Sequence, residues 1–224
     1  MPDGAVRDMA ARIAQMQPPR ELAVVHCSGA LGLDVLSSLD RNPRGSFHPL
    51  QSFPAPRDAS AFRGITIAVD ATQPLLERRL RGIARRLGAR PRHVGDGERV
   101  VYHAAAVFAS NFVDVVVAEA IGLLRGIGWS EKESLDSLMP LVAGAVSNIR
   151  QRGPIRALTG PIRRGDADTV SRHLAVMDNA ALYRMLALVA LEIAQQAGLE
   201  PAAAERTRRA LTRNVAATQR RSGR

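Results

Sequence analysis

The sequence predicts an α/β domain followed by an all-helical domain, and three observations support this. Up to residue 95, short β-branched runs alternate with segments of helical periodicity, and beyond it only helical periodicity remains. The chain has 224 residues, of which 46% are hydrophobic, so each part can bury a core. Strands that alternate with helices form a parallel or mixed sheet. We therefore predict domains at residues 1–95 and 96–224.

The first predicted domain consists of short strands separated by helices. Strands are expected where β-branched or aromatic residues lie between turn residues, at 22–27, 46–53, 64–70 and 92–94. Pro49 places the second of these at a sheet edge or at the end of a strand. Helices are expected at Leu33–Leu39 and 74–88, and the latter has a proline near its first turn and a glycine at its end.

The second predicted domain begins with a long helix at 98–126 that is apolar nearly all round, which predicts burial inside a bundle or a dimer. Ser130 and Glu133 form a capping box at the start of the next helix, which is expected to end near residue 150. A loop rich in Gly, Pro and Arg is expected at 153–166, where Asp166 caps the following helix. Three further helices are expected: from Asp166 to Met177, from Asp178 or Asn179 to Ala197, and from Glu200 onward.

The net charge of +10 is concentrated at the C-terminus. Lys132 is the only lysine among 31 basic residues, and the tail at 205–224 carries seven arginines and one glutamate. Such a tail could bind nucleic acid or acidic lipid, but we favour a solvated helix end. Aromatic residues make up 4% of the chain and none lies among the tail's arginines, so base stacking is not expected.

Composition also limits the class of protein. A single cysteine excludes a disulfide framework and a multi-thiolate metal site. Charges interrupt even the most apolar stretch, 100–124, so no membrane span is expected. The first residues, Met1-Pro-Asp-Gly-Ala, show no secretory leader. We therefore predict a soluble cytoplasmic protein.

Four motifs together resemble a known family. In order along the chain they are His26-Cys-Ser-Gly-Ala-Leu-Gly, Phe47-His-Pro-Leu-Gln-Ser-Phe, Tyr102-His-Ala-Ala-Ala-Val-Phe-Ala-Ser-Asn and Leu158-Thr-Gly-Pro-Ile-Arg-Arg-Gly-Asp. They are similar to motifs of Rossmann-fold NAD(P)-dependent oxidoreductases whose C-terminal helical domain is labelled a domain of unknown function. That helical domain resembles the one in 6-phosphogluconate dehydrogenase, with pyrroline-5-carboxylate reductase and ketopantoate reductase as distant relatives. The resemblance implies NAD(P) as cofactor and a homodimer formed through the helical domain.

One departure from the family concerns the cofactor. The family begins with a strand, a Gly-rich turn and a helix, and such a turn lets the backbone approach the pyrophosphate. Here the only comparable stretch, Gly29-Ala-Leu-Gly32, is too short and follows the wrong strand. We expect only the second half of a Rossmann-like sheet and impaired cofactor binding. Translation assigned to start at an internal GTG codon would account for the difference.

Residues on the long helix are the predicted catalytic group. His103, Val107 and Asn111 are spaced by four residues, so they share one face of a continuous helix. The resemblance implies that His103 takes the place of a proton-donating lysine and that Asn111 and Tyr102 orient the substrate. Imidazole suits this role because it titrates near neutral pH. The alternative is that these side chains are satisfied by helix packing.

Two strand ends carry further candidates for substrate binding. His26 and Ser28 lie where the first strand runs out into a turn, a position where α/β sheets contact ligands, and His48 and Gln51 lie in a similar segment around Pro49. The two histidines could converge on a substrate or on His103, or they could brace the turns through structural hydrogen bonds. No metal site is expected, because the histidines and the cysteine lack the close spacing of zinc ligands.

The loop after residue 153 supplies a predicted acid clamp. Thr159, Gly160 and Arg164 offer a hydroxyl, an amide and a guanidinium to a carboxylate or phosphate. The alternative is helix capping, which we expect of Asp166 in any case. His173 is expected to make an interhelical contact.

The sequence therefore predicts an NAD(P)-dependent oxidoreductase that reduces a small carbonyl or imine acid. A non-catalytic helical dimer or small-acid-binding protein is the alternative, and a module that binds nucleic acid or lipid through its tail is a third. A small-molecule substrate is the expected partner, and neither a membrane nor nucleic acid is expected.

Overall fold

The computed structural model describes residues 1–213, and it divides into two compact units, Met1–Val116 and Val117–Arg224. The first unit holds a sheet and its covering helices, whereas the second is helical throughout its described part. The secondary structure becomes purely helical after residue 95, near the predicted domain boundary. The compact units divide later, inside a helix, because the first helix after the sheet belongs with the sheet.

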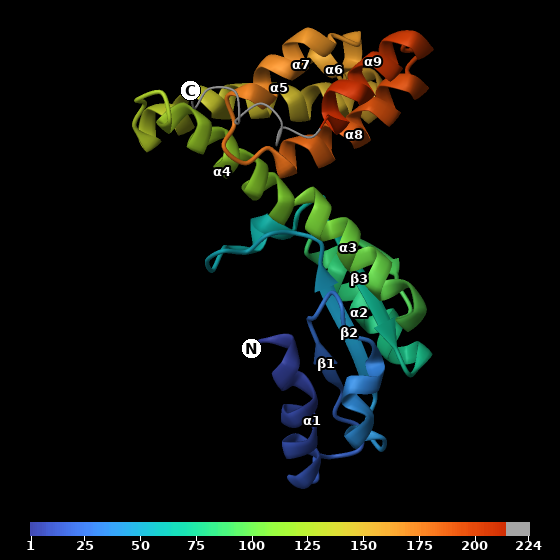
Figure 1. Cartoon of the computed structure of the whole chain (residues 1–224). Coiled ribbons are helices and arrows are strands. Elements are labelled where there is room, and N and C mark those ends of the chain that lie inside the picture. The colour runs from blue at the N-terminus through green and yellow to red at the C-terminus, as the bar shows by residue number, and fades with distance from the viewer. Residues whose placement is uncertain (214–224) are drawn as a thin grey trace. The chain divides into compact units, whose positions relative to one another are not determined.

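The first unit is built on a mixed sheet of four strands in the order β1-β2-β3-β4 (Figure 1). These strands are β1 (Val24–His26), β2 (Arg44–Pro49), β3 (Thr66–Ala71) and β4 (Arg90–His93). The pairs β1–β2 and β3–β4 are parallel, and β2 is antiparallel to β3. All four predicted strands are present, although β2 ends at Pro49, where the backbone amide that a ladder needs is missing.

The two faces of the sheet differ in chemistry, because successive side chains in a strand point to opposite sides. Helix α2 (Pro74–Arg86) packs on the apolar face, where Phe47, Val69 and Leu80 contribute to one core cluster. On the opposite face, His26 is paired in register with Ser46, and Ser46 with Asp70. The face of the sheet opposite α2 therefore carries buried polar side chains.

Helix α1 (Val6–Gln15) packs beside β1 against the 3-10 helix η2 (Leu33–Leu39). Residues of both elements, among them Ala10 and Leu36, form a small core cluster. The sequence analysis predicted η2 but not α1. Three shorter 3-10 helices are η1 (Asp3–Ala5), η3 (Ala59–Phe62) and η4 (Asp96–Glu98).

The long helix predicted at 98–126 is interrupted. It consists of α3 (Arg99–Ala109) and α4 (Asn111–Arg125), which are separated by Ser110 with φ −129° and ψ −76°. The prediction of one continuous helix was therefore wrong at this residue. A serine favours such breaks because its hydroxyl can compete for backbone hydrogen bonds.

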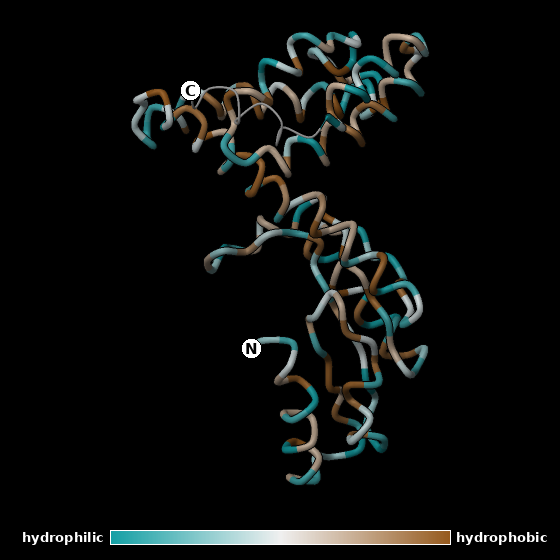
Figure 2. The backbone as a smooth tube through the Cα atoms, viewed as in Figure 1, coloured by the Kyte–Doolittle hydropathy of each residue, from teal (hydrophilic) through white to brown (hydrophobic). Residues whose placement is uncertain are grey.

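The segment Asp96–Arg125 is nevertheless strongly apolar (Figure 2). By length and composition alone it could cross a membrane, with a mean hydropathy of 1.8, which the sequence analysis did not anticipate. None of its most apolar window is buried within the chain, so the expected burial inside the chain's own bundle is not found. Asp114 and Glu119 lie within the segment, and a carboxylate at the centre of a membrane span costs about 3 kcal/mol.

The described part of the second unit continues with five helices after α4. They are α5 (Glu131–Ala157), α6 (Gly160–Arg164), α7 (Ala167–Ala175), α8 (Ala181–Gln196) and α9 (Pro201–Thr212). Helices α6 to α9 share a core cluster that includes Ile162, Val170 and Leu191. The prediction of a loop at 153–166 was wrong, because this stretch holds the end of α5 and all of α6.

Several predicted caps are confirmed. Ser130 and Glu133 form the capping box of α5, and Asp166 Oδ1 accepts a hydrogen bond from the Thr169 amide at the start of α7. Helix α5 is continuous up to Gly153, whose φ of +75° marks a kink. Of the predicted basic tail, residues 214–224 lie outside the described part of the chain.

Candidate functional site

A turn at the end of β1 organises the candidate site in the first unit. The Ser28 hydroxyl donates a hydrogen bond to Asp3 Oδ2 (2.8 Å) and accepts from the amides of Ala30 and Leu31. The hydroxyl predicted to bind substrate thus already holds the turn. Directly after it, Gly29 is buried.

Gly29 is the point where two imidazoles meet. A side-chain carbon at this position would lie 2.8 Å from His48 Cε1 and Nε2, and also 2.8 Å from His103 Cδ2. His48 comes from the end of β2 and His103 from α3, so residues distant in sequence converge on one backbone position. Only glycine leaves room for both rings here, because real Cβ atoms do not approach other atoms this closely.

Tyr102 joins this pair from α3. Its hydroxyl lies 2.8 Å from His48 Nδ1, and the two rings meet edge to face with their centroids 5.5 Å apart. Since His48 uses Nδ1 for this bond, its Nε2 remains directed at the turn around Gly29. His48 and Tyr102 therefore form a hydrogen-bonded pair that can hold and pass a proton, and His103 lies at the same turn.

Arg99 lies beneath the group and was not singled out in the sequence. Its side chain is only 1% exposed. The guanidinium donates hydrogen bonds to Ser46 Oγ and to the Ser28 carbonyl (3.5 Å), so it ties β2 to the turn after β1. Its Nε lies 4.0 Å from Asp96 Oδ1 and makes no hydrogen bond. A permanent positive charge thus lies under the histidines.

His26 also lies on the polar face of the sheet, in register with Ser46. It is 6% exposed, and neither ring nitrogen has a hydrogen-bond partner among the described residues. Burial, together with the charge of Arg99, lowers the pKa of His26 below its ordinary value. The ring is therefore neutral at pH 7, which agrees with its unpartnered burial.

Burial and the charge of Arg99 also act on His48 and Tyr102. Burial lowers the pKa of His48, and the neighbouring His103 and Arg99 lower it further, against a small opposing effect of Asp3. Burial raises the pKa of Tyr102. At neutral pH His48 is therefore a neutral acceptor or donor, and the Tyr102 hydroxyl keeps its proton.

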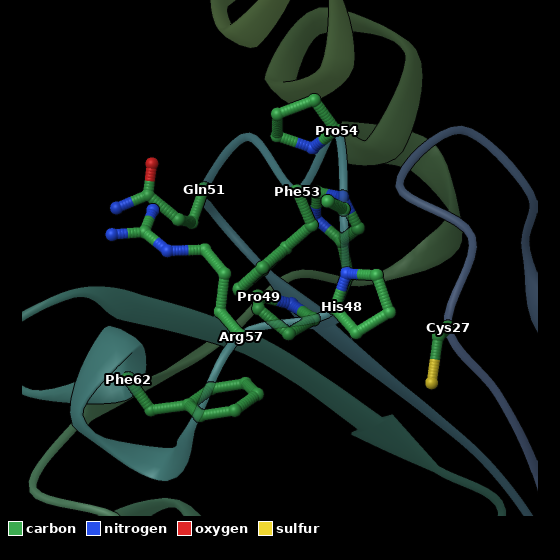
Figure 3. Close-up of a pocket in the computed structure, with 10 residues that line it drawn as sticks. Cys27, His48, Pro49, Gln51, Phe53, Pro54, Arg57 and Phe62 are labelled. Atoms are coloured by element: carbon green, nitrogen blue, oxygen red, sulfur yellow. The ribbon is translucent and has the colours of Figure 1, made fainter.

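A groove of about 660 Å³ adjoins His48 (Figure 3). It is lined by Cys27, Gln51, Phe53, Arg57 and Phe62, together with prolines of the loop that follows β2. Cys27 is exposed, but partial burial raises the pKa of its thiol. The cysteine is therefore not an activated nucleophile. The groove places an apolar surface and the polar side chains of Gln51 and Arg57 next to His48.

Not every predicted residue joins this group. Asn111 follows the break at Ser110 and is exposed, so the argument that it shares a helical face with His103 does not hold. Thr159, Gly160 and Arg164 lie in the second unit, where Thr159 begins α6 without a side-chain capping bond. Arg164 is exposed in the last turn of that helix.

His173 has the predicted interhelical role. Its Nδ1 lies 2.9 Å from the Tyr183 hydroxyl, which joins α7 to α8. Arg99 could have been found from the sequence, because it lies three residues before Tyr102 and four before His103, on the same helical face.

The described residues contain neither a cluster of metal ligands nor a glycine-rich start of an α-helix. No group of three His, Cys, Asp or Glu side chains that could hold a metal is found among residues 1–213. The one α-helix that directly follows a strand, α2 after β3, opens with Gln73 and Pro74 rather than with glycines. Glycines do follow β1 (Gly29, Gly32) and β4 (Gly95, Gly97), but each turn leads into a 3-10 helix, so no Gly-x-Gly-x-x-Gly turn opens an α-helix among residues 1–213.

Comparisons with known proteins place these features in context. Residues 65–190 match the family described as "Domain of unknown function (DUF2520)". No curated protein is similar in sequence to this chain. A crystal structure from Bacteroides fragilis, described as a candidate NADP oxidoreductase, is 26% identical with a TM-score of 0.74, over 87% of this chain and 73% of that one.

Two further structures share the fold. A protein from Thermotoga maritima is 24% identical with a TM-score of 0.71, over 88% of this chain and 77% of its own. The NADP-bound pyrroline carboxylate reductase of Plasmodium falciparum is 9% identical with a TM-score of 0.54, over 93% of this chain and 77% of its own. The predicted fold class, a Rossmann-like mixed sheet followed by a helical region, is confirmed.

Proposed function

We propose that this chain, which residues 65–190 make a member of the DUF2520 family, is an NAD(P)-dependent oxidoreductase that reduces a small carbonyl or imine acid. The observation that carries the proposal is the convergence of His48 and His103 on Gly29. This convergence lies at the end of β1, where α/β sheets bind ligands. The similarity to a candidate NADP oxidoreductase at 26% identity supports the reaction class.

The chain's own part in the reaction is to supply a proton and to hold the acid. A carbonyl oxygen or imine nitrogen that gains a hydride must also gain a proton. His103 donates this proton and regains one from solvent, while His48 and Tyr102, joined by a 2.8 Å hydrogen bond, orient the reacting group. Tyr102 keeps its proton at neutral pH because burial raises its pKa.

The carboxylate of the substrate is bound in the groove beside His48. The acid clamp that the sequence assigned to Thr159, Gly160 and Arg164 lies in the second unit and remains a proposal. Arg57 and Gln51, however, line the groove next to His48 within the same unit. Asn111 is exposed beyond the break at Ser110, and its predicted role in orienting the substrate remains a proposal.

The proton-donor role is tested by turnover. A panel of 2-oxo acids and cyclic imino acids is incubated with NADPH and the chain, and the loss of NADPH absorbance is followed. His103→Gln is expected to lower kcat by roughly 10²- to 10⁴-fold. His173→Gln, which removes a histidine bonded to a tyrosine in the other unit, serves as the control. Equal rates for His103→Gln and the unaltered chain would contradict the role.

Cofactor affinity is a separate proposal. We expect the 224-residue chain to bind dinucleotide weakly, because its described residues form no Gly-rich cradle. NADPH fluorescence is titrated with this chain and with one translated from an earlier in-frame start codon. Markedly tighter binding by the longer chain is expected, whereas tight binding by the 224-residue chain would contradict the proposal.

A non-catalytic small-acid-binding protein is the second candidate, and the absence of the cradle from the described residues favours it. The turnover assay separates the two, because a binding protein would bind the acid without oxidising NADPH in either length of chain.

Assembly as a homodimer is also proposed. Within the described chain, α5 buries only Ser134, while Leu141, Val146 and Ile149 are exposed. An exposed helix with this much apolar surface normally packs against a partner. A cytoplasmic location and the absence of a membrane or nucleic-acid partner remain predictions of the sequence.

A further inference from the structure

We infer that the groove beside His48 selects acids that carry a flat apolar side group, with Arg57 binding the carboxylate and Phe53 and Phe62 binding the side group. This inference deepens the proposed function by naming a substrate class for the same site. It assigns roles to three residues to which the family resemblance gave none.

The size of the groove fits such a ligand. Its volume of about 660 Å³ lies within the range of about 300–1,000 Å³ that is usual for small-molecule sites. A two- or three-carbon acid would leave most of this space to water. A substrate with a ring-sized side group would fill more of it.

The apolar wall is aromatic. The rings of Phe53 and Phe62 lie with their centroids 5.5 Å apart at an angle of 35°. Phe53 comes from the loop after β2 and Phe62 from η3, so two separate elements build the surface. Phe53 is 39% exposed, which leaves part of its ring open to the groove. Aromatic rings favour a flat partner that can stack or meet them edge to face.

The polar groups suit a carboxylate. Arg57 and Gln51 reach from the same loop, and both extend away from Cys27 in the view of Figure 3. The groove's lining includes no Asp or Glu among the described residues. A guanidinium and an amide can together donate several hydrogen bonds to one carboxylate.

Nearby groups leave Arg57 available. The adjacent carboxylate, Asp58, accepts a hydrogen bond from the Ser60 amide (2.7 Å) and caps η3. Gln51 accepts from the Ser52 amide through Oε1, which leaves its NH₂ group to donate. No ion pair of Arg57 is found in the part of the chain that the structure describes.

Three probes separate charge from side group without any cofactor. Phenylpyruvate carries both features, pyruvate lacks the ring, and phenylacetone replaces the carboxylate with a methyl group. Calorimetric titration of the full chain is expected to show phenylpyruvate binding at least about tenfold more tightly than either of the others, since one charge-assisted hydrogen bond contributes about 1.5–3 kcal/mol.

Variants then assign the two features to residues. Arg57→Met is expected to weaken phenylpyruvate about tenfold or more and to leave phenylacetone unchanged, while Arg57→Lys restores part of the loss. Phe62→Ala is expected to weaken phenylpyruvate and phenylacetone alike. Arg79→Met removes an exposed arginine of α2, outside the groove, and is the matched control. Circular dichroism of each variant verifies folding.

The outcomes distinguish this inference from the proposed function. If Arg57→Met and Arg79→Met bind phenylpyruvate equally well, or if pyruvate binds as tightly as phenylpyruvate, the inference is wrong even where NADPH oxidation is observed. If the selective binding is found but neither length of chain oxidises NADPH, the proposed function fails and the groove's assignment remains.

Discussion

At the scale of single residues, the site depends on a buried positive charge under neutral imidazoles. Arg99 is tied to Ser46 and to the Ser28 carbonyl, and its charge contributes to lowering the pKa of both His26 and His48. The arrangement keeps the rings neutral so that they can accept and donate protons near pH 7.

Removing that charge should change the titration of His48. In Arg99→Met, the pKa of His48 is expected to rise, because a nearby positive charge no longer disfavours the imidazolium ion. The ring signals of His48 in an NMR pH titration measure this directly. Arg99→Lys retains the charge and should leave the pKa near that of the unaltered chain. Arg92→Met, at an exposed position of β4, is the control, and an unchanged pKa in Arg99→Met would contradict the electrostatic role.

Gly29 should tolerate no side chain. Gly29→Ala places a carbon 2.8 Å from both His48 and His103, so one ring must move. We expect a loss of about 1–3 kcal/mol in the free energy of unfolding, as measured with urea. Gly97→Ala is the matched control, because no atom lies within 4 Å of the added carbon. Equal stabilities of the two variants would show that the rings do not crowd this turn.

The sequence predicted much of the site but not its arrangement. His26, His48, Tyr102 and His103 could be named because titratable groups at strand ends and on one helix face are visible in the printed residues. Asn111 was misplaced because the helical periodicity of the sequence continues through Ser110, where the helix is broken. Arg57 lies in a loop without periodicity, so its proximity to His48 could not be predicted.

At the scale of elements, the strands and most of the helices were predictable because periodicity and capping residues mark them. All four strands and both predicted helices of the first unit are present, with boundaries shifted by a few residues. Helix α1 was missed although its residues Val6, Ala10 and Ile13 follow a helical spacing. Helix α6 was missed because Gly160 and Pro161 resemble a turn, yet a proline in the first turn suits a helix start.

The capping box of α5 should contribute measurably to stability. The Ser130 hydroxyl accepts from the Glu133 amide and donates to Glu133 Oε2 (2.7 Å). Ser130→Ala is expected to lower the free energy of unfolding by about 1 kcal/mol. Ser137→Ala, on an exposed turn of the same helix, should change it by less than about 0.5 kcal/mol. Similar losses for both variants in thermal or urea unfolding would contradict the capping role.

At the scale of the whole molecule, a mixed sheet with one polar face lies in one unit and a helical core in the other. The sequence identified both from the change in periodicity near residue 95. It could not predict where the compact units divide, because that depends on which helices pack together.

The exposed apolar surface of α5 leads to a prediction about assembly. The double variant Leu141→Asp, Ile149→Asp places two charges on a surface that we propose is buried between two copies. We expect the unaltered chain to sediment as a dimer and the variant as a monomer with an unchanged circular dichroism spectrum. Gln151→Asp, also on α5, controls for added charge. A monomeric unaltered chain would contradict the proposed dimer.

The convergence of His48 and His103 on one turn is the claim on which the proposed function depends, and it can be measured without ligand or cofactor. A nuclear Overhauser experiment on the full chain, with histidine rings selectively labelled, detects ring protons that lie close together. We predict a cross-peak between the rings of His48 and His103. If both rings are observed and no cross-peak joins them, the two imidazoles do not share a site and the account is wrong.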